Sequence, residues 1–361
     1  MSGEKVEEPD MRGSRFLVAA VVVLLVACGG KLPGGKGVPG GGDIPGGGNV
    51  PGGLGGSSGM VDPNTCGNYA ASEAGARLHA FLEAVADLQK QSQETVEVVK
   101  TSCKMMGKEL GMNDGDFPDS METKDVCAKV WGAYNDAFKV GLKGKAALKV
   151  TYKPAVCRVD VKATAEIAAK CEGKASADVG ASCSGTCKGK CDGTCAGGAK
   201  AGGGGAGGGG ECNGQCKGKC EGECEGHADV KASGQCKAKA QASASAEMKC
   251  TEPELKVTLD AKLVVDKSKA EMVVKALQNG VPKLLSIKAR LAPLQAAVET
   301  TVSTAKELKD MGPKFVNSFK DQALCITGQV AAAANAAMSI QANVNVSVSV
   351  SAEASGSVGG G

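Results

Sequence analysis

The sequence predicts an α+β protein: an antiparallel helical bundle that carries a very long, disulfide-stapled antiparallel β-hairpin, joined by a third strand at the C-terminus. Two periodicities lead to this fold class. Apolar residues recur at helical spacing on both sides of the chain's centre, whereas the centre itself alternates with a period of two. A palindrome of cysteines in the alternating region then predicts how its two arms pair.

The chain has 361 residues, and its composition divides it into six segments. We expect an export signal at 1–27, a lipid anchor and Gly/Pro-rich tether at 28–65, the first half of a helical part at 66–145, the β-hairpin at 146–263 with a Gly-rich tip loop at 196–211, the second half of the helical part at 264–339, and a C-terminal strand and tail at 340–361. The hairpin would thus interrupt the helical part.

Composition limits the class of protein. Aromatic residues make up only 3% of the chain and glycines number 53, so a large single globular core is not expected. The net charge is +3 with the charges interspersed, and no basic tract indicates nucleic acid as a partner. The 17 cysteines, with only two histidines, favour an oxidising compartment.

Five segments predict helices from the spacing of their apolar residues. They are 72–111, 121–141, 268–278, 282–309 and 313–338. We expect Ser268 and Glu271 to form a capping box that starts the third helix, and the Asn-Gly pair after it to end that helix. Pro282 suits a helix start, while Pro293 should kink its helix. The apolar stripes predict the core of a bundle.

The central region predicts two long strands. From 157 to 195 every odd residue is Cys, Val, Ala, Ile or Gly, and nearly all even residues are polar. Residues 212–250 show the same alternation on even numbers, as half-buried strands do. We expect one continuous hairpin, closed by the loop 196–211, with arms that could reach about 160 Å.

The cysteines predict the register of this hairpin. In an antiparallel pair, the numbers of directly opposite residues have a constant sum, and a sum of 407 aligns every cysteine of the two arms. The predicted disulfides are Cys157–Cys250, Cys171–Cys236, Cys183–Cys224, Cys187–Cys220, Cys191–Cys216 and Cys195–Cys212. The same sum places Pro154 opposite Pro253, where the apolar parity of both arms changes, and Val150 opposite Val257.

Disulfides would supply the stability that the hairpin's small side chains do not. Ala and Gly bury little area, an isolated two-stranded hairpin is marginal in water, and directly opposed Cα atoms lie within disulfide range. Four further cysteines could form two more bridges whose pairing the sequence leaves open: Cys66, Cys103, Cys127 and Cys325. Zinc or a soft metal at the tip cysteines is the alternative, but strand neighbours spaced Cys-x3-Cys lie about 13 Å apart. We therefore expect no metal and no other cofactor.

Residues 340–354 alternate Ile, Val and Ala with Ser and Asn, and predict the third strand. Antiparallel pairing with the 212–250 arm would cover one edge of the hairpin. The alternative is a frayed low-complexity tail.

The N-terminal region has the form of an export signal. Residues 11–28 begin with two arginines and continue with an apolar run that is too short for an ordinary membrane span. The run ends in "LVAC", which resembles the lipobox of bacterial lipoproteins. The resemblance implies cleavage before Cys28 and a lipid on its sulfur; the alternative is an uncleaved signal anchor. Glycines, not aspartate, follow Cys28, which in lipoproteins of two-membraned bacteria favours the outer membrane.

No nucleophile motif or nucleotide-binding loop supports an enzyme. We expect a non-enzymatic cell-envelope lipoprotein, anchored in the outer membrane and facing the periplasm or the exterior, that projects a rigid rod for structural, adhesive or partner-binding roles. Its partners would be the bilayer, through the anchor, and a second copy along the flat Ala/Gly face of the hairpin.

Two other functions are alternatives. A helical bundle with a β-tongue resembles α-helical pore-forming toxins in outline, so the chain could be a pore-forming or membrane-associated protein, although a charged tongue is wrong for lipid. A cysteine-rich metal-binding protein is the second alternative.

Overall fold

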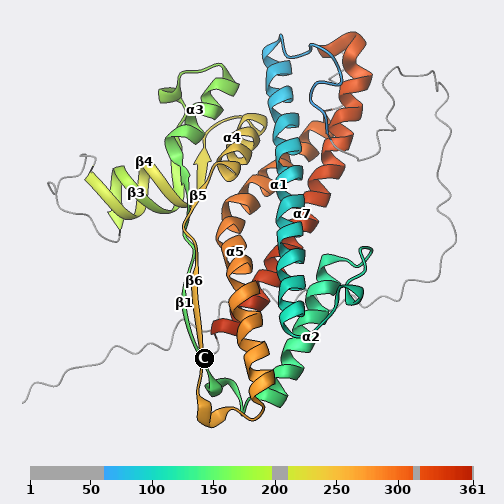
Figure 1. Ribbon diagram of the computed structural model, residues 1–361. Helices are drawn as coiled ribbons and strands as arrows, with labels where there is room; N and C mark the ends of the chain where they lie inside the picture. Colours follow the sequence, from blue (N-terminus) through green and yellow to red (C-terminus); the bar gives the residue numbers. More distant parts are fainter. Residues whose placement is uncertain (1–60, 197–209, 312–317, 360–361) are drawn as a thin grey trace, which may run out of the picture. The chain divides into compact units, whose positions relative to one another are not determined.

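The computed structural model describes residues 61–196, 210–311 and 318–359, and has long helices and antiparallel sheets (Figure 1). The helices are α1 (Glu73–Glu109), α2 (Thr123–Gly141), α3 (Val161–Glu172), α4 (Gly234–Ala246), α5 (Lys267–Asp310) and α7 (Ala323–Gly359). The strands are β1 (Leu148–Lys153), β2 (Cys157–Asp160), β3 (Ala181–Ala196), β4 (Gly210–Val230), β5 (Lys249–Cys250) and β6 (Glu254–Leu259). The predicted α+β class with a disulfide-stapled hairpin is confirmed.

The helical bundle is built around α1, α5 and α7, which pack along one another, while α2 and α4 pack on α1 and α5 (Figure 1). The apolar stripes of these helices form the main core. The largest fully buried side chains include Phe81, Leu88, Leu284, Leu308 and Ile326. Helical periodicity in the sequence therefore identified residues that lie inside the bundle.

Two disulfides brace the bundle and supply the pairing that the sequence left open. Cys103–Cys127 joins α1 to α2, with 5.2 Å between the Cα atoms. Cys66–Cys325 joins the segment before α1 to the beginning of α7, and the residues between these two cysteines include most of the described chain. The second bridge therefore holds the first and last parts of the bundle together.

Helix α5 runs without a break through Asn279, Gly280 and both of its prolines, so the predicted end after residue 278 and start at Pro282 are wrong. Gly280 lies against α1, where an added Cβ would come 1.9 Å from Cγ of Met106. The glycine thus serves a close approach of two helices instead of ending one of them.

The N-terminus of α5 also differs from the prediction. The cap is Asp266, whose carboxylate accepts a hydrogen bond of 3.0 Å from the backbone N–H of Lys269. Ser268 and Glu271, expected as a capping box, lie inside the helix. An aspartate two residues earlier reaches the free N–H groups of the first turn and starts the helix sooner.

The expected C-terminal strand is wrong, because α7 continues to Gly359. A row of buried residues follows α7 at alternating spacings of three and four. The row is Ala323, Ile326, Val330, Ala333, Ala337, Ile340, Val344, Ser347, Ser351 and Ala354. In an alternating sequence, residues four apart are of the same kind, so apolar residues also recur at a spacing found on one face of a helix. Where a step of three brings a serine onto this face, its small side chain fits between α7 and its neighbours α1 and α5.

The outer part of the hairpin pairs in the predicted register. β1 and β6 are antiparallel, with Leu148 opposite Leu259 and Val150 opposite Val257. β2 and β5 continue the pairing, with Cys157 opposite its disulfide partner Cys250. The constant sum of residue numbers therefore holds over this part.

The hairpin is not continuous, however, because α3 and α4 replace both arms between β2 and the tip. The expected rod and its flat Ala/Gly face are therefore wrong. Asp160 caps α3 by accepting a 3.0 Å hydrogen bond from the N–H of Ala163, and Gly173 ends α3 at φ 67°. Alanine is the best helix former, so an alternation of Ala with Lys, Glu and Gln suits a helix as well as a strand.

Candidate functional site

β3 and β4 form the tip of the hairpin and wind into what we call the stapled coil, residues 181–196 and 210–230 (Figure 1). Along one edge of β3, Cys187 lies opposite Cys224; along its other edge, Cys187 lies opposite Gly214. Two stretches of β4 therefore flank the same stretch of β3, as in successive turns of a wound ribbon. At the base of the coil, β2 pairs with β4, with Val159 opposite Cys224.

Four disulfides inside the stapled coil join the cysteines that the palindrome pairs: Cys183–Cys224, Cys187–Cys220, Cys191–Cys216 and Cys195–Cys212. The expectation that bridged residues lie directly opposite each other is wrong here. Cys187 faces Cys224 in the ladder but is bonded to Cys220, four residues along β4. Winding shifts the ladder, so each bridge crosses the interior of the coil, where Cys187 and Cys220 are only 0% and 2% exposed.

The glycines midway between these cysteines permit the winding. Gly189 lies opposite Gly222, and Gly193 lies opposite Gly218. All four have φ between 145° and 152°, which residues other than glycine rarely adopt. A Cβ on Gly222 would lie 2.4 Å from the carbonyl oxygen of Lys188. The repeat Cys-x-Gly-x therefore places sulfur inside the coil and bare backbone where the two strands approach.

The polar side chains of the coil form cross-strand pairs of opposite charge. Lys190 lies opposite Glu221 on one edge of β3 and opposite Glu211 on the other. Nζ of Lys188 lies 2.8 Å from the Glu225 carboxylate. Such pairs support the register and intersperse charges of both signs over the coil, which carries six carboxylates and four lysines.

Arg158 on β2 fastens the stapled coil to the rest of the hairpin. Its Nε lies 3.1 Å from Glu225 and its Nη1 lies 3.5 Å from Glu223. Burial alone would raise the pKa of Glu225, but the hydrogen bonds and charges of Lys188 and Arg158 outweigh burial and lower the pKa below 4.5. The Glu225 carboxylate is therefore charged at neutral pH, as the contact with Arg158 requires.

A buried carboxylate, Glu172, joins α3 to both α4 and α1. Its side chain is 4% exposed, its Oε1 accepts a 2.6 Å hydrogen bond from the backbone N–H of Ser233, and its Oε2 lies 2.9 Å from Arg77 on α1. Burial alone would raise the pKa of Glu172, but the hydrogen bond from the Ser233 backbone and the charges of Arg77 and a neighbouring lysine lower it below 4.5. The disulfide Cys171–Cys236 holds the same two helices together beside this contact.

The predicted cysteines of the described residues all lie in disulfides, eight bridges in total. Within the described ranges, no group of His, Cys, Asp and Glu is suited to hold a metal ion. So many disulfides indicate an oxidising location, extracellular or periplasmic. Cys28, the predicted lipid site, and residues 197–209 of the tip loop lie outside the described residues.

Sequence reasoning missed Arg158 and Glu172, because neither has a motif around it. The helix caps at Asp160 and Gly173 were the available signal, since together they would have located α3 and placed Glu172 at its end. No family model, curated protein or solved structure matches this chain. The chemistry of the site therefore follows from its geometry: in the described part of the coil, disulfides occupy the interior and fix the backbone from which the outer side chains project.

We predict that Gly222→Ala prevents the coil from closing correctly. The new Cβ would meet the Lys188 carbonyl, and the backbone conformation alone costs a non-glycine residue about 1–3 kcal/mol. Thiol titration and non-reducing peptide mapping should find free or mispaired tip cysteines. Thr194→Ala, at an exposed position of the same coil, should give the native map. A native disulfide map in Gly222→Ala would show that the glycine is not required.

We predict that Glu172→Gln lowers the free energy of unfolding by about 1–3 kcal/mol at pH 7, because charged hydrogen bonds are lost. Since the folded-state pKa of Glu172 is below 4.5, its ionisation stabilises the protein above that pH, and this stabilisation is lost as the pH falls through the folded-state pKa. Denaturant unfolding of both proteins from pH 7 to pH 3 should therefore show a difference that shrinks below pH 4.5. The exposed Glu166→Gln on the same helix should change stability by less than about 0.5 kcal/mol. A difference independent of pH would contradict the assignment.

Proposed function

We propose that this chain is a non-enzymatic cell-envelope lipoprotein whose helical domain presents the stapled coil to a partner, in a structural, adhesive or binding role. The lipid would be attached to Cys28, the Gly/Pro-rich segment that follows would act as the tether, and the anchor would lie in the outer membrane. The observation that carries the proposal is the coil itself: its described part is cross-linked by four disulfides and is fastened to a helical bundle.

Rigidity is what makes such a coil useful for binding. A surface that is already ordered loses little conformational entropy when a partner docks, so more of the contact energy appears as affinity. Disulfides across the interior, together with the Arg158 contacts at the base, favour one fixed arrangement of the outer side chains. The interspersed charges of both signs support a protein or polymer partner that is recognised by the pattern of charge.

The anchor is tested by Cys28→Ser. We expect this variant to leave the membrane fraction or to accumulate as an uncleaved precursor, because serine cannot form the thioether. Fractionation and intact-mass measurement would detect either result. Gly29→Asp should keep the lipid but move the protein from the outer to the inner membrane, which separates anchoring from sorting. A Cys28→Ser protein that remains in the membrane with the normal mature mass would refute the lipoprotein proposal.

A second candidate function, a pore-forming or membrane-associated protein, is favoured by one feature of α7. The segment Lys320–Gly356 is long and apolar enough to cross a membrane, with a mean hydropathy of 1.4 in its most apolar window, of which only 39% is buried. Its start is tied to the N-terminal side of α1 by Cys66–Cys325. Insertion of α7 would therefore be easier once this bridge is removed.

A leakage experiment separates the two functions. Under our first proposal, neither the wild-type chain nor the double variant Cys66→Ser/Cys325→Ser should release dye from liposomes, because α7 packs in the bundle core. Under the second, the double variant should release dye at lower concentration than the wild type. Removing Cys103–Cys127, which leaves the start of α7 tied, is the matched control. Reproducible leakage that depends on Cys66–Cys325 would replace our first proposal.

A further inference from the structure

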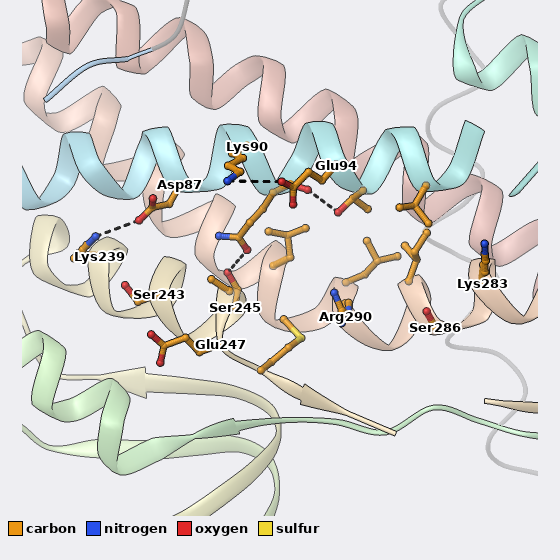
Figure 2. A pocket seen from close by; sticks show the side chains of 18 residues that line it. Asp87, Lys90, Glu94, Lys239, Ser243, Ser245, Glu247, Lys283, Ser286 and Arg290 are labelled. Atoms are coloured by element: carbon orange, nitrogen blue, oxygen red, sulfur yellow. Dashed lines mark hydrogen bonds and ion pairs between the residues drawn. The ribbon is translucent and has the colours of Figure 1, made fainter. Parts of the chain in front are cut away.

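A cavity of about 890 Å³ lies between α1, α4 and α5, apart from the stapled coil (Figure 2). This volume is in the range of small-molecule binding sites. Its apolar lining consists of Val98, Met248, Ile287, Leu291 and Leu294, with Ala246 beside them. Val98 is 42% exposed, although most large apolar side chains of the bundle are buried. Ile287, Leu291 and Leu294 belong to the bundle core and are at most 5% exposed, so the accessible apolar surface of the cavity lies mainly at Val98 and Met248.

On α1 and α4 the charges that line the cavity are paired within the protein. Lys239 lies 3.1 Å from Asp87 and 3.3 Å from Glu83, and Lys90 lies 4.0 Å from Glu94 (Figure 2). Ser245 and Gln91 hydrogen-bond to each other between the same two helices. These contacts leave little there for a ligand's charge to bind.

The α5 wall is different, because its cations have no carboxylate partner. Lys283, Ser286 and Arg290 follow one another at helical spacing and face the cavity (Figure 2). Within the part of the chain that the structure describes, Arg290 makes no hydrogen bond or ion pair, and Lys283 contacts only the Met105 sulfur, at 3.9 Å. Glu247 lines the cavity near α4, away from Arg290 in Figure 2.

We propose that this cavity binds an amphiphilic anion, a long-chain carboxylate, with its head group at Arg290 and Lys283 and its chain along Val98 and Met248. A guanidinium binds a carboxylate through two parallel hydrogen bonds, and Ser286 can donate a third. An apolar chain would cover the uncovered apolar surface beside them. The proposal does not rest on the function of the coil or on the lipid at Cys28.

The test uses the full chain in nanodiscs of neutral phosphatidylcholine, so that no detergent competes for the cavity, with empty discs as background. Equilibrium dialysis against labelled dodecanoate should show saturable binding of one equivalent. Arg290→Glu should weaken it at least tenfold, because a repulsive charge replaces the head-group partner. Arg290→Lys, which keeps the charge but loses the paired hydrogen bonds, should bind more weakly than the wild type and more tightly than Arg290→Glu. Lys275→Glu, an exposed residue of α5 outside the cavity, should leave it unchanged.

Dodecyltrimethylammonium, which has the same chain and the opposite head charge, should show no saturable binding, and neither should acetate, which lacks the chain. Circular dichroism and the disulfide map should show that each variant is folded. Absence of saturable dodecanoate binding, equal binding by Arg290→Glu and wild type, or equal binding of the cationic amphiphile would each overturn the proposal.

Discussion

Four disulfides fill the inside of the stapled coil, and the rest of the hairpin depends on this packing. Sulfur can occupy the interior only because glycine backbones, such as Gly189 against Gly222, let the strands approach where any side chain would meet a carbonyl. The arms then leave the coil together, joined by a 2.8 Å hydrogen bond from the N–H of Lys231 to the oxygen of Gly180. A fixed exit of both arms allows helices to follow on each side.

Below the coil, disulfides join the two arms of the hairpin where the hydrogen bonds of a continuous pair of strands are absent. Cys171–Cys236 joins α3 to α4, and Cys157–Cys250 joins the strands just beneath them. The residue numbers of each bridged pair have the same sum as those of the opposite residues in β1 and β6. The two strands therefore pair in the register predicted for a continuous hairpin, although α3 and α4 lie between them and the coil. Gln278 of α5 donates a 3.3 Å hydrogen bond to the carbonyl of Val257 in β6 and so holds the ribbon against the bundle. The two arms therefore stay side by side along the hairpin, although they are strands in some places and helices in others.

Sequence alone predicted the covalent framework better than the local structure. Residue numbers that share one sum identify partners such as Cys157 and Cys250 whatever secondary structure lies between them, because a disulfide records proximity and not conformation. Alternation failed where the side chains were small: alanines in α3 and serines such as Ser347 in α7 fit a helix stripe as readily as a strand face. The contact of Glu172 with Arg77 and the cavity at Arg290 depend on how helices pack, which neither spacing nor composition encodes.

Helix α4 connects the coil to the cavity, and its sequence explains how. Its apolar residues are alanines and one cysteine, so it can pack closely on several sides: Ala238 and Ala242 pack into the main core, while Ala240 packs into the second core beneath the coil. Gln241 reaches the coil at the Ala228 carbonyl, and Lys239 reaches α1 at the edge of the cavity. Because α4 is also bonded to α3 through Cys236, its position is set covalently. The contacts of Lys239 with Asp87 and of Ser245 with Gln91 hold α4 against α1 as well, and a cavity wall held on both sides lowers the free-energy cost of ordering when a ligand binds.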